Sequence, residues 1–384
     1  MGTTADLDRA TGLGQTNEPD GTTGPVRAHA PGQPAEQEPE GTDLAAEHLL
    51  RIINDAGAGI LLSIGYQSGL LDTMGALPPA STQQIADAAG LDERYVREIV
   101  HGLLSTGIVE AAGEGAFSLG PAYVPVVTGP GVDNLARMTR YLTLMGEVTP
   151  KVVEAVRHGG GLGYEDYPGF HRIQAEESAA VNDASLLSEI IPLTGEVGRL
   201  EAGIDVADIG CGQGHAVSLL ARAFPASRFV GLDFSPEAIG EARAEAAAWG
   251  LGNAKFELAD VAELSDESAF DLVTAFDAIH DQARPADVLA AVRRALRPGG
   301  TFLMVDIRAS SVPAENAELP WAAFLYAIST VHCMSVSLGQ GGAGLGTVWG
   351  VQRAERMLRE AGFGDVELKD LDGDPFNAYV VARP

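Results

Sequence analysis

The sequence predicts an α/β protein, with a doubly wound sheet in the carboxyl-terminal half and a helical domain in front of it. Residues 206–209 are an apolar run, as in a buried parallel strand, and a glycine-rich turn and an amphipathic helix follow. Two later strand-like segments, 229–233 and 255–259, each end at or beside an aspartate. Ahead of them, residues 81–119 have the pattern of two capped helices and a hairpin.

The glycine-rich turn is the expected centre of a ligand site. A strand, a glycine turn and a helix N-terminus together bind nucleotide-like ligands in doubly wound sheets. The pattern here is Asp-x-Gly-x-Gly-x-Gly from Asp208, whereas dinucleotide-binding turns have G-x-G-x-x-G. Asp233 ends the second strand and can accept both ribose hydroxyls of an adenosine, and Asp260 is placed to meet an adenine amino group. A nicotinamide-dependent enzyme is the alternative interpretation.

At these three strand ends the chain resembles the class I S-adenosylmethionine-dependent methyltransferases. The resemblance implies a Rossmann-like, seven-stranded methyltransferase sheet that ends in a helix and a two-stranded hairpin, with S-adenosylmethionine as the cofactor. The cofactor-binding residues that it implies are Asp208, Gly210, Gly212, Gly214, Asp233, Phe234, Asp260, Val261 and Phe276.

Residues 81–119 are predicted to form a winged helix, and such a domain precedes the core of small-molecule O-methyltransferases. There it serves dimerisation and closes the substrate site. The outward face of its second helix carries two acidic and two basic residues between Glu93 and Glu98, which offers phosphates no net attraction. A long apolar helix before Leu77 indicates a homodimer. A regulator that binds S-adenosylmethionine and DNA is a weaker alternative.

Composition divides the chain into four parts. Residues 1–43 are rich in Gly, Pro, Thr and Glu without apolar periodicity, so we expect a disordered tail. Residues 44–125 are expected to form the winged-helix domain, and 126–200 a helical linker that roofs the active site. Residues 201–384 complete the methyltransferase domain.

Charge and cysteine content narrow the possible partners and the compartment. The formal net charge of −28 excludes nucleic acid as an expected partner. Two cysteines and the lack of a signal-peptide pattern indicate a reduced, cytoplasmic protein. Because no run of about 18 apolar residues occurs, we expect no membrane span.

His280 and Asp281 follow the predicted fourth strand, where ligands of open α/β sheets bind. They look like the His-Asp pair that supplies the catalytic base in plant-type O-methyltransferases. A histidine suits this role because its pKa lies near neutrality. We therefore expect His280 to take the proton of an acceptor hydroxyl during O-methylation.

His332 lies in an apolar stretch after the predicted fifth strand and gives a second possibility. His280, Asp281 and His332 together would suit non-haem Fe(II). They match the iron ligands of some α-keto-acid C-methyltransferases of this superfamily, which hold the substrate as its enolate. The base without a metal is the preferred interpretation, and in that case His332 is expected to line the acceptor pocket.

Two glycine-rich segments complete the predicted site. Residues 159–170 join glycines to aromatic residues and predict a structured loop near the ligand, with Tyr164 and Phe170 as possible contacts. Residues 339–346 lack the Lys-Ser/Thr of a phosphate loop and are expected to form a mobile lid. A protein that binds the cofactor but has lost transfer chemistry is a further alternative.

Overall fold

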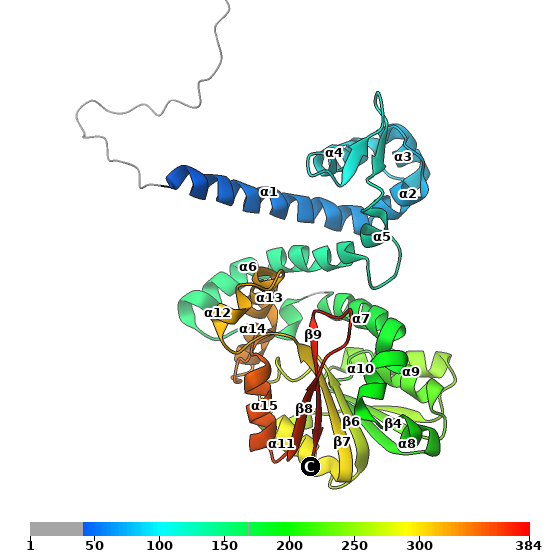
Figure 1. Ribbon diagram of the computed structural model, residues 1–384, viewed down its shortest axis with the longest axis vertical. Coiled ribbons are helices and arrows are strands. Elements are labelled where there is room, and N and C mark those ends of the chain that lie inside the picture. The colour runs from blue at the N-terminus through cyan, green and yellow to red at the C-terminus, as the bar shows by residue number, and fades with distance from the viewer. Residues whose placement is uncertain (1–40, 168) are drawn as a thin grey trace, which may run out of the picture. The chain divides into compact units, whose positions relative to one another are not determined.

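The computed structural model describes residues 41–167 and 169–384 (Figure 1). The predicted disordered tail therefore lies almost wholly outside the described residues. The chain forms two compact units, residues 1–52 and 53–384, and helix α1 is assigned over Thr42–Gln67. Apolar residues of α1 such as Leu49, Leu50 and Ile53 are exposed in the single chain.

Two helical stretches are long and apolar enough to cross a membrane by length and composition alone. They are Thr42–Gln67 and Ala322–Gly339, of which 11% and 39% respectively are buried inside the protein. Helices of soluble proteins pass the same test, so this observation is weak. The expected absence of a membrane span stays a prediction.

The winged helix forms where the sequence predicts it. Helices α2 (Leu70–Ala76), α3 (Thr82–Ala89) and α4 (Glu93–Leu104) precede the hairpin of β1 (Val109–Ala111) and β2 (Phe117–Leu119). Ser81 and Gln84 form a reciprocal capping box on α3, and the Asp92 carboxylate caps α4. The buried stripe of α4 is Val96, Ile99, Val100 and Leu103. On its outward face Arg94 pairs with Glu98 and Arg97 pairs with Glu93, so both cations are neutralised locally.

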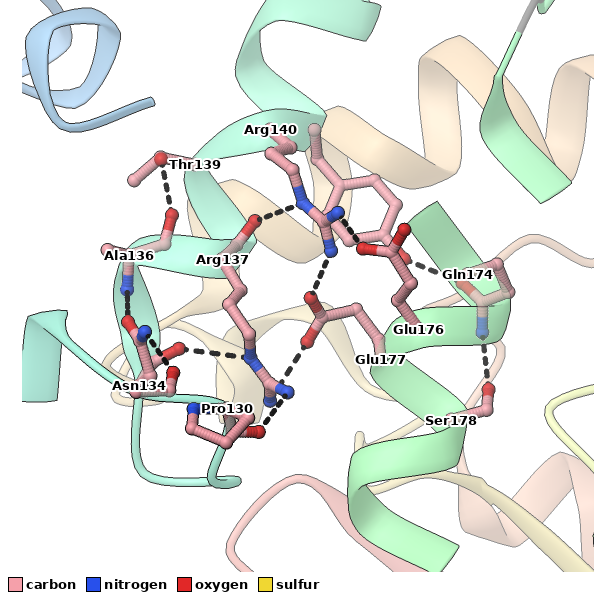
Figure 2. Close-up of polar contacts among 12 residues, drawn as sticks. Pro130, Asn134, Ala136, Arg137, Thr139, Arg140, Gln174, Glu176, Glu177 and Ser178 are labelled. Carbon is pink, nitrogen blue, oxygen red and sulfur yellow. Dashed lines mark hydrogen bonds and ion pairs between the residues drawn. The ribbon is translucent and has the colours of Figure 1, made fainter. Parts of the chain in front are cut away.

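The linker is helical, as predicted, and contains a charge network whose Arg137, Arg140 and Glu177 are largely buried, whereas Glu176 is half exposed (Figure 2). Its main helices are α5 (Val124–Val127), α6 (Arg140–His158), α7 (Phe170–Val181) and the π-helix Asn182–Ile190. Arg140 binds Glu176 and Glu177, and Arg137 also reaches Glu177 at 3.3 Å. Removing one partner of such a buried set would leave a charge uncompensated. The network therefore fixes α7 against the start of α6.

The carboxyl-terminal domain is a seven-stranded sheet with helices on both faces. The strands are β3 (Asp205–Ile209), β4 (Arg228–Asp233), β5 (Ala254–Leu258), β6 (Phe270–Phe276), β7 (Leu296–Ile307), β8 (Asp365–Lys369) and β9 (Asn377–Arg383). Their order is β5-β4-β3-β6-β7-β9-β8, and β9 runs antiparallel to both of its neighbours. The predicted seven strands and the final hairpin are confirmed. The carboxyl ends of the parallel strands meet at one edge, where ligands of such sheets bind.

Apolar side chains on both faces of the sheet hold the helices in place. Helices α9 (His215–Ala223) and α10 (Pro236–Ala248) pack on one face through Val217, Leu220 and Ile239. Helices α11 (Pro285–Ala295) and α15 (Val351–Glu360) pack on the other through Val292 and Leu358. The carboxyl ends of the parallel strands, at the edge between these two faces, carry the candidate site.

The insertion after β7 contains α12 (Pro313–Asn316), α13 (Ala322–Ile328), the π-helical turn Ser329–Cys333 and α14 (Met334–Gly339). The glycine-rich segment that follows differs from the expected mobile lid. Backbone N–H groups of Ala343 and Gly346 donate to the carbonyl groups of Ala283 and His280, at 2.9 and 3.2 Å. These bonds make the segment a fixed wall beside the loop that carries His280.

Candidate active site

The glycine turn joins β3 to α9, and all three of its glycines have positive φ: 66° at Gly210, 53° at Gly212 and 74° at Gly214. A Cβ at Gly210 would lie 2.6 Å from Ala278, so close packing excludes a side chain there. A Cβ at Gly212 would meet nothing within 4 Å. The backbone at Gly212 is therefore open on the side where a ligand can approach it.

Asp233 links this turn to the end of β4. Its carboxylate accepts hydrogen bonds from the N–H groups of Gly212, at 2.9 Å, and Ser235, at 2.8 Å. The side chain is buried, yet it borders a pocket at the carboxyl edge of the sheet. The pocket is lined by Tyr164, Gly210, Asp233, Phe234, Ala259, Asp260, Val261, Ala262, Asp281, Gln282, Ala283, Arg284 and Gln340.

His280 lies on the loop after β6 and is 4% exposed. Its Nδ1 is 2.8 Å from Oδ1 of Asp306, near the carboxyl end of β7. Burial lowers the pKa of His280, but the Asp306 carboxylate and Cys333 raise it by more, so the pKa lies well above its usual value. In the neutral tautomer in which Nδ1–H donates to Asp306, Nε2 is the proton acceptor, and it becomes available once the imidazole is deprotonated.

Asp281 does not pair with His280. Its Oδ2 instead accepts a hydrogen bond from the Tyr164 hydroxyl at 3.0 Å, which joins the loop after α6 to the loop after β6. Burial raises the pKa of Asp281 to about 6, although His280 and Tyr164 oppose the shift. Asp306 is thus the carboxylate that holds His280, and Asp281 holds Tyr164. The catalytic roles expected of His280 and Asp281 stay predictions.

His332 is enclosed by aromatic rings. It stacks on Phe170 with ring centroids 3.5 Å apart, and the Tyr167 and Tyr164 rings lie at 4.7 and 5.8 Å. In the described part of the chain neither of its ring nitrogens has a hydrogen-bond partner. Burial, with a contribution from His280, lowers the pKa of His332 to about 3, so the imidazole is neutral at physiological pH.

Two models of known protein families match segments of this chain. Residues 200–362 match the family model of a methyltransferase domain, and residues 56–128 match that of an Rv2258c-like winged helix-turn-helix domain. The chain carries a class I methyltransferase domain. Its sheet, glycine turn and strand-end aspartates are the parts that the resemblance implied, and its winged helix lies in front.

Individual relatives agree with this assignment. The chain is 38% identical over 101 residues to a trans-aconitate 2-methyltransferase of Methylobacterium nodulans, which is 26% of this chain and 37% of the relative. It is 33% identical over 147 residues to a fatty-acid O-methyltransferase of Mycolicibacterium smegmatis, which is 38% and 51% of the two chains. This chain therefore spans about a third to a half of the curated relatives that it matches.

A solved structure extends the likeness over most of the chain at the level of fold. Human N-acetylserotonin methyltransferase in complex with S-adenosylmethionine has a TM-score of 0.62 and 17% identity. The match covers 90% of this chain and 99% of that one. This likeness shows the fold of the methyltransferase domain and its helical neighbour.

Five of the nine expected cofactor-binding residues line the pocket of the methyltransferase domain: Gly210, Asp233, Phe234, Asp260 and Val261. Asp260 is also held by Arg284, at 2.8 Å, and by the N–H of Ala262, at 2.9 Å. Gly212 takes part through its bond to Asp233. Asp208 is instead buried within the sheet, where it accepts a hydrogen bond from the Thr274 hydroxyl at 2.6 Å. Gly214 and Phe276 pack inside the domain.

Sequence reasoning missed Asp306, Arg284 and Gln340. Asp306 lies near the carboxyl end of a predicted strand, the same signal that identified Asp233 and Asp260, and could have been found in that way. Arg284 and Gln340 reach the pocket only through tertiary packing. No pattern in the sequence marks them.

The expected iron ligands, His280, Asp281 and His332, stay a prediction, and the structure brings together a different group of donor atoms. The donor atoms that lie within 4.8 Å of one another belong to Asp277, His280 and Asp306. Asp281 and His332 are not part of this group within the described residues. The Asp277 Oδ1 and Asp306 Oδ2 atoms are buried without hydrogen-bond partners, so the group offers oxygen and nitrogen donors that would fit a small divalent cation.

Proposed function

We propose that the protein methylates a small-molecule acceptor on oxygen, with S-adenosylmethionine as methyl donor and His280 as general base. The observation that carries this proposal is the buried His280–Asp306 pair beside the pocket of a methyltransferase domain. In the neutral imidazole this pair leaves Nε2 of His280, which lies beside Cys333, as the proton acceptor. A base held in one tautomer by a carboxylate is suited to deprotonate a hydroxyl group.

The residues of the pocket would hold the donor by its adenosine half. The Asp233 carboxylate can accept the ribose hydroxyls, and Gly212 leaves its backbone accessible. S-adenosylmethionine supplies a methyl group that is electrophilic because it is bonded to a sulfonium. Nε2 of His280 takes the acceptor's hydroxyl proton as the oxygen bonds to the methyl carbon and the sulfur–carbon bond breaks. Asp306 stabilises the imidazolium that forms.

Calorimetry with S-adenosylhomocysteine tests the donor site. Gly212→Val would place a side chain where the ligand passes, and Asp233→Ala would remove the acceptor for the ribose hydroxyls, at a cost of roughly 1–3 kcal/mol. Asp72→Ala, which lies in the winged helix, is the matched control and should bind normally. Wild-type affinity in both site variants would overturn the assignment of the pocket.

C-methylation of an α-keto acid or a similar enolate at Fe(II) is the second candidate. The orphaned oxygens of Asp277 and Asp306 favour it, because buried carboxylates without partners are suited to bind a cation. Activity that is abolished by chelators and restored by Fe(II) would support it. Equal damage from His332→Ala and His280→Ala would restore the ligand set predicted from the sequence.

We further propose a homodimeric protein of the cytoplasm whose partner is a small molecule, with neither nucleic acid nor membrane as a binding partner. The exposed apolar residues of α1 support the dimer. The neutralised arginines of α4 argue against a DNA-binding regulator. We also propose the division of the chain into four parts with boundaries at 43, 125 and 200, and the segments 56–128 and 200–362 matched by the two family models support its second and fourth parts.

A further inference from the structure

The order of the strands gives the donor pocket a direction along the edge of the sheet. Four neighbouring strands lie in the order β5-β4-β3-β6, and the pocket takes residues from the loop after each of them. Asp260 follows β5, Asp233 ends β4, and Asp281 lies in the loop after β6. Neighbouring strands are about 4.8 Å apart, so the strand that leads to Asp281 lies about 10 Å from the strand that ends in Asp233, on the side away from Asp260.

This direction decides which part of the donor lies near Asp281. In the proposed function the adenine lies at Asp260 and the ribose hydroxyls at Asp233. The sulfur of S-adenosylmethionine is bonded to the carbon that projects from the ribose, on the side of the sugar away from the adenine. The sulfonium therefore extends past β4 toward the loop that carries Asp281.

The two ends of the pocket differ in charge. At the adenine end, the Arg284 guanidinium binds Asp260 at 2.8 Å and Glu263 at 3.2 Å. At the other end, Asp281 accepts a hydrogen bond from the neutral Tyr164 hydroxyl, and no lysine or arginine of residues 41–167 and 169–384 pairs with it. A positive charge on a ligand would therefore find its compensation beside Asp281.

His280 does not cancel the charge of Asp281. Its raised pKa makes the imidazole a cation, but Nδ1 lies 2.8 Å from the Asp306 carboxylate, so this pair is already neutral as a unit. Burial raises the pKa of Asp281 to about 6, with Asp306 and Asp233 adding to the shift and His280 and Tyr164 opposing it. At pH 8 the Asp281 carboxylate is therefore ionised for most of the time.

We propose that Asp281 is the counter-charge of the donor's sulfonium and that it favours binding of S-adenosylmethionine over the uncharged product. The inference rests on the proposed methyltransferase function and deepens it. In the transfer the bond between sulfur and the methyl carbon breaks, its electron pair stays on sulfur, and the sulfonium becomes the neutral thioether of S-adenosylhomocysteine. The attraction to Asp281 is lost at that step, which favours release of the product. Because the charge on sulfur already declines in the transition state, Asp281 acts in donor binding and exchange and does not speed the chemical step.

Calorimetry on Asp281→Asn at pH 8 tests this pairing with three ligands. They are S-adenosylmethionine, S-adenosylhomocysteine and sinefungin, an analogue whose protonated amine takes the place of the methyl sulfonium. The amide oxygen can still accept the Tyr164 bond, so the loop keeps its contact. The two cationic ligands should bind about tenfold more weakly than to the wild type, whereas S-adenosylhomocysteine should change by about twofold at most. Asp281→Glu, which keeps the charge, should retain the preference for the cationic ligands.

Asp260→Asn is the matched control, because it removes a carboxylate from the adenine end of the same pocket. It should weaken the three ligands to the same extent, since all of them carry the adenine. Equal weakening of the three ligands in Asp281→Asn, or no weakening of any, would overturn the inference. Failure of S-adenosylhomocysteine to bind the wild type would instead overturn the proposed function.

Discussion

Asp306 connects the sheet to the chemistry of the site. It follows the buried apolar residues of β7, and it holds His280 from a loop 26 positions earlier in the chain. Strand backbones are rigid, so a carboxylate at this place fixes the imidazole more firmly than a loop residue would. His280 and Asp306 are thus expected to act as one unit.

Replacing His280 by Ala tests the base. Methyl transfer should slow by roughly 10²–10⁴-fold, because the acceptor hydroxyl loses its proton acceptor. The affinity for S-adenosylhomocysteine, measured by calorimetry, should barely change, since His280 does not line the donor pocket. An unchanged rate of transfer would rule out His280 as the base and leave Tyr164 and Phe170 as the residues to examine next.

Asp306→Asn should change the pH dependence of the reaction as well as its rate. His280 must be deprotonated to act as a base, so activity rises with pH through its pKa. Because the Asp306 carboxylate raises that pKa, its loss should move the rise in activity to lower pH. The maximal rate should fall roughly tenfold or more, as the amide can favour the wrong tautomer. Rate measurements from pH 5 to 10 would show both effects, and an unmoved profile would contradict the pairing.

At the scale of residues, the sequence places His280 and Asp281 after the fourth strand but does not reveal that Asp306 is the carboxylate that holds His280. Asp281 is predicted because His280-Asp281 resembles the His-Asp pair of plant-type O-methyltransferases, yet successive residues of a loop point in different directions. The partner comes from β7 instead, and only the parallel pairing of β6 with β7 brings the two together. The neutrality of His332 likewise depends on burial by rings from α7 and the preceding loop, which no local pattern reveals.

At the scale of elements, the buried Asp208 in β3 makes the stability of the folded protein depend on pH. Burial and the charge of Asp233 raise the pKa of Asp208 to about 7, although the Thr274 hydroxyl opposes the shift. The native state therefore binds this proton more tightly than the unfolded chain, whose value is near 4. The free energy of unfolding should fall as the pH rises from about 4 to 7.

Asp208→Asn should remove most of this dependence, because the amide oxygen can still accept the Thr274 bond without becoming charged. We expect the variant to be more stable than the wild type at pH 8 by roughly 1–4 kcal/mol, and close to it at pH 4.5. Urea unfolding of the ligand-free protein at the two pH values measures this. Equal stabilities at pH 8 would show that Asp208 is already charged at little cost.

Strands and helices of regular pattern were predictable, and irregular ones were not. The helix Val351–Glu360 and the strand Phe270–Phe276 follow from apolar periodicity, capping and turn residues. The π-helical turns at Asn182–Ile190 and Ser329–Cys333 have no such signature. Glycine content alone suggested mobility for residues 339–346, whereas backbone bonds to the His280 loop hold them.

At the scale of the whole molecule, the apolar surface of α1 predicts self-association. Leu44, Leu49, Leu50, Ile52 and Ile53 are all more than half exposed, which a soluble monomer avoids over so long a stretch. Light scattering on a chain shortened by residues 1–40 should give twice the monomer mass at micromolar concentration. Leu49→Glu together with Ile53→Glu should give the monomer. A monomeric mass before substitution would contradict the prediction.

The contact between Gly161 and α14 limits how the pocket beside Tyr164 can be changed. A Cβ at Gly161 would collide with the Ser335 carbonyl and the Gly339 amide, and the N–H of Leu162 bonds to Ser335. The loop that carries Tyr164 is therefore fixed against α14, the helix that follows His332. In directed evolution the loop around Gly161 and residues 332–339 should therefore be exchanged together. A loop taken from a relative is expected to fit only with the residues that correspond to 332–339 in that relative.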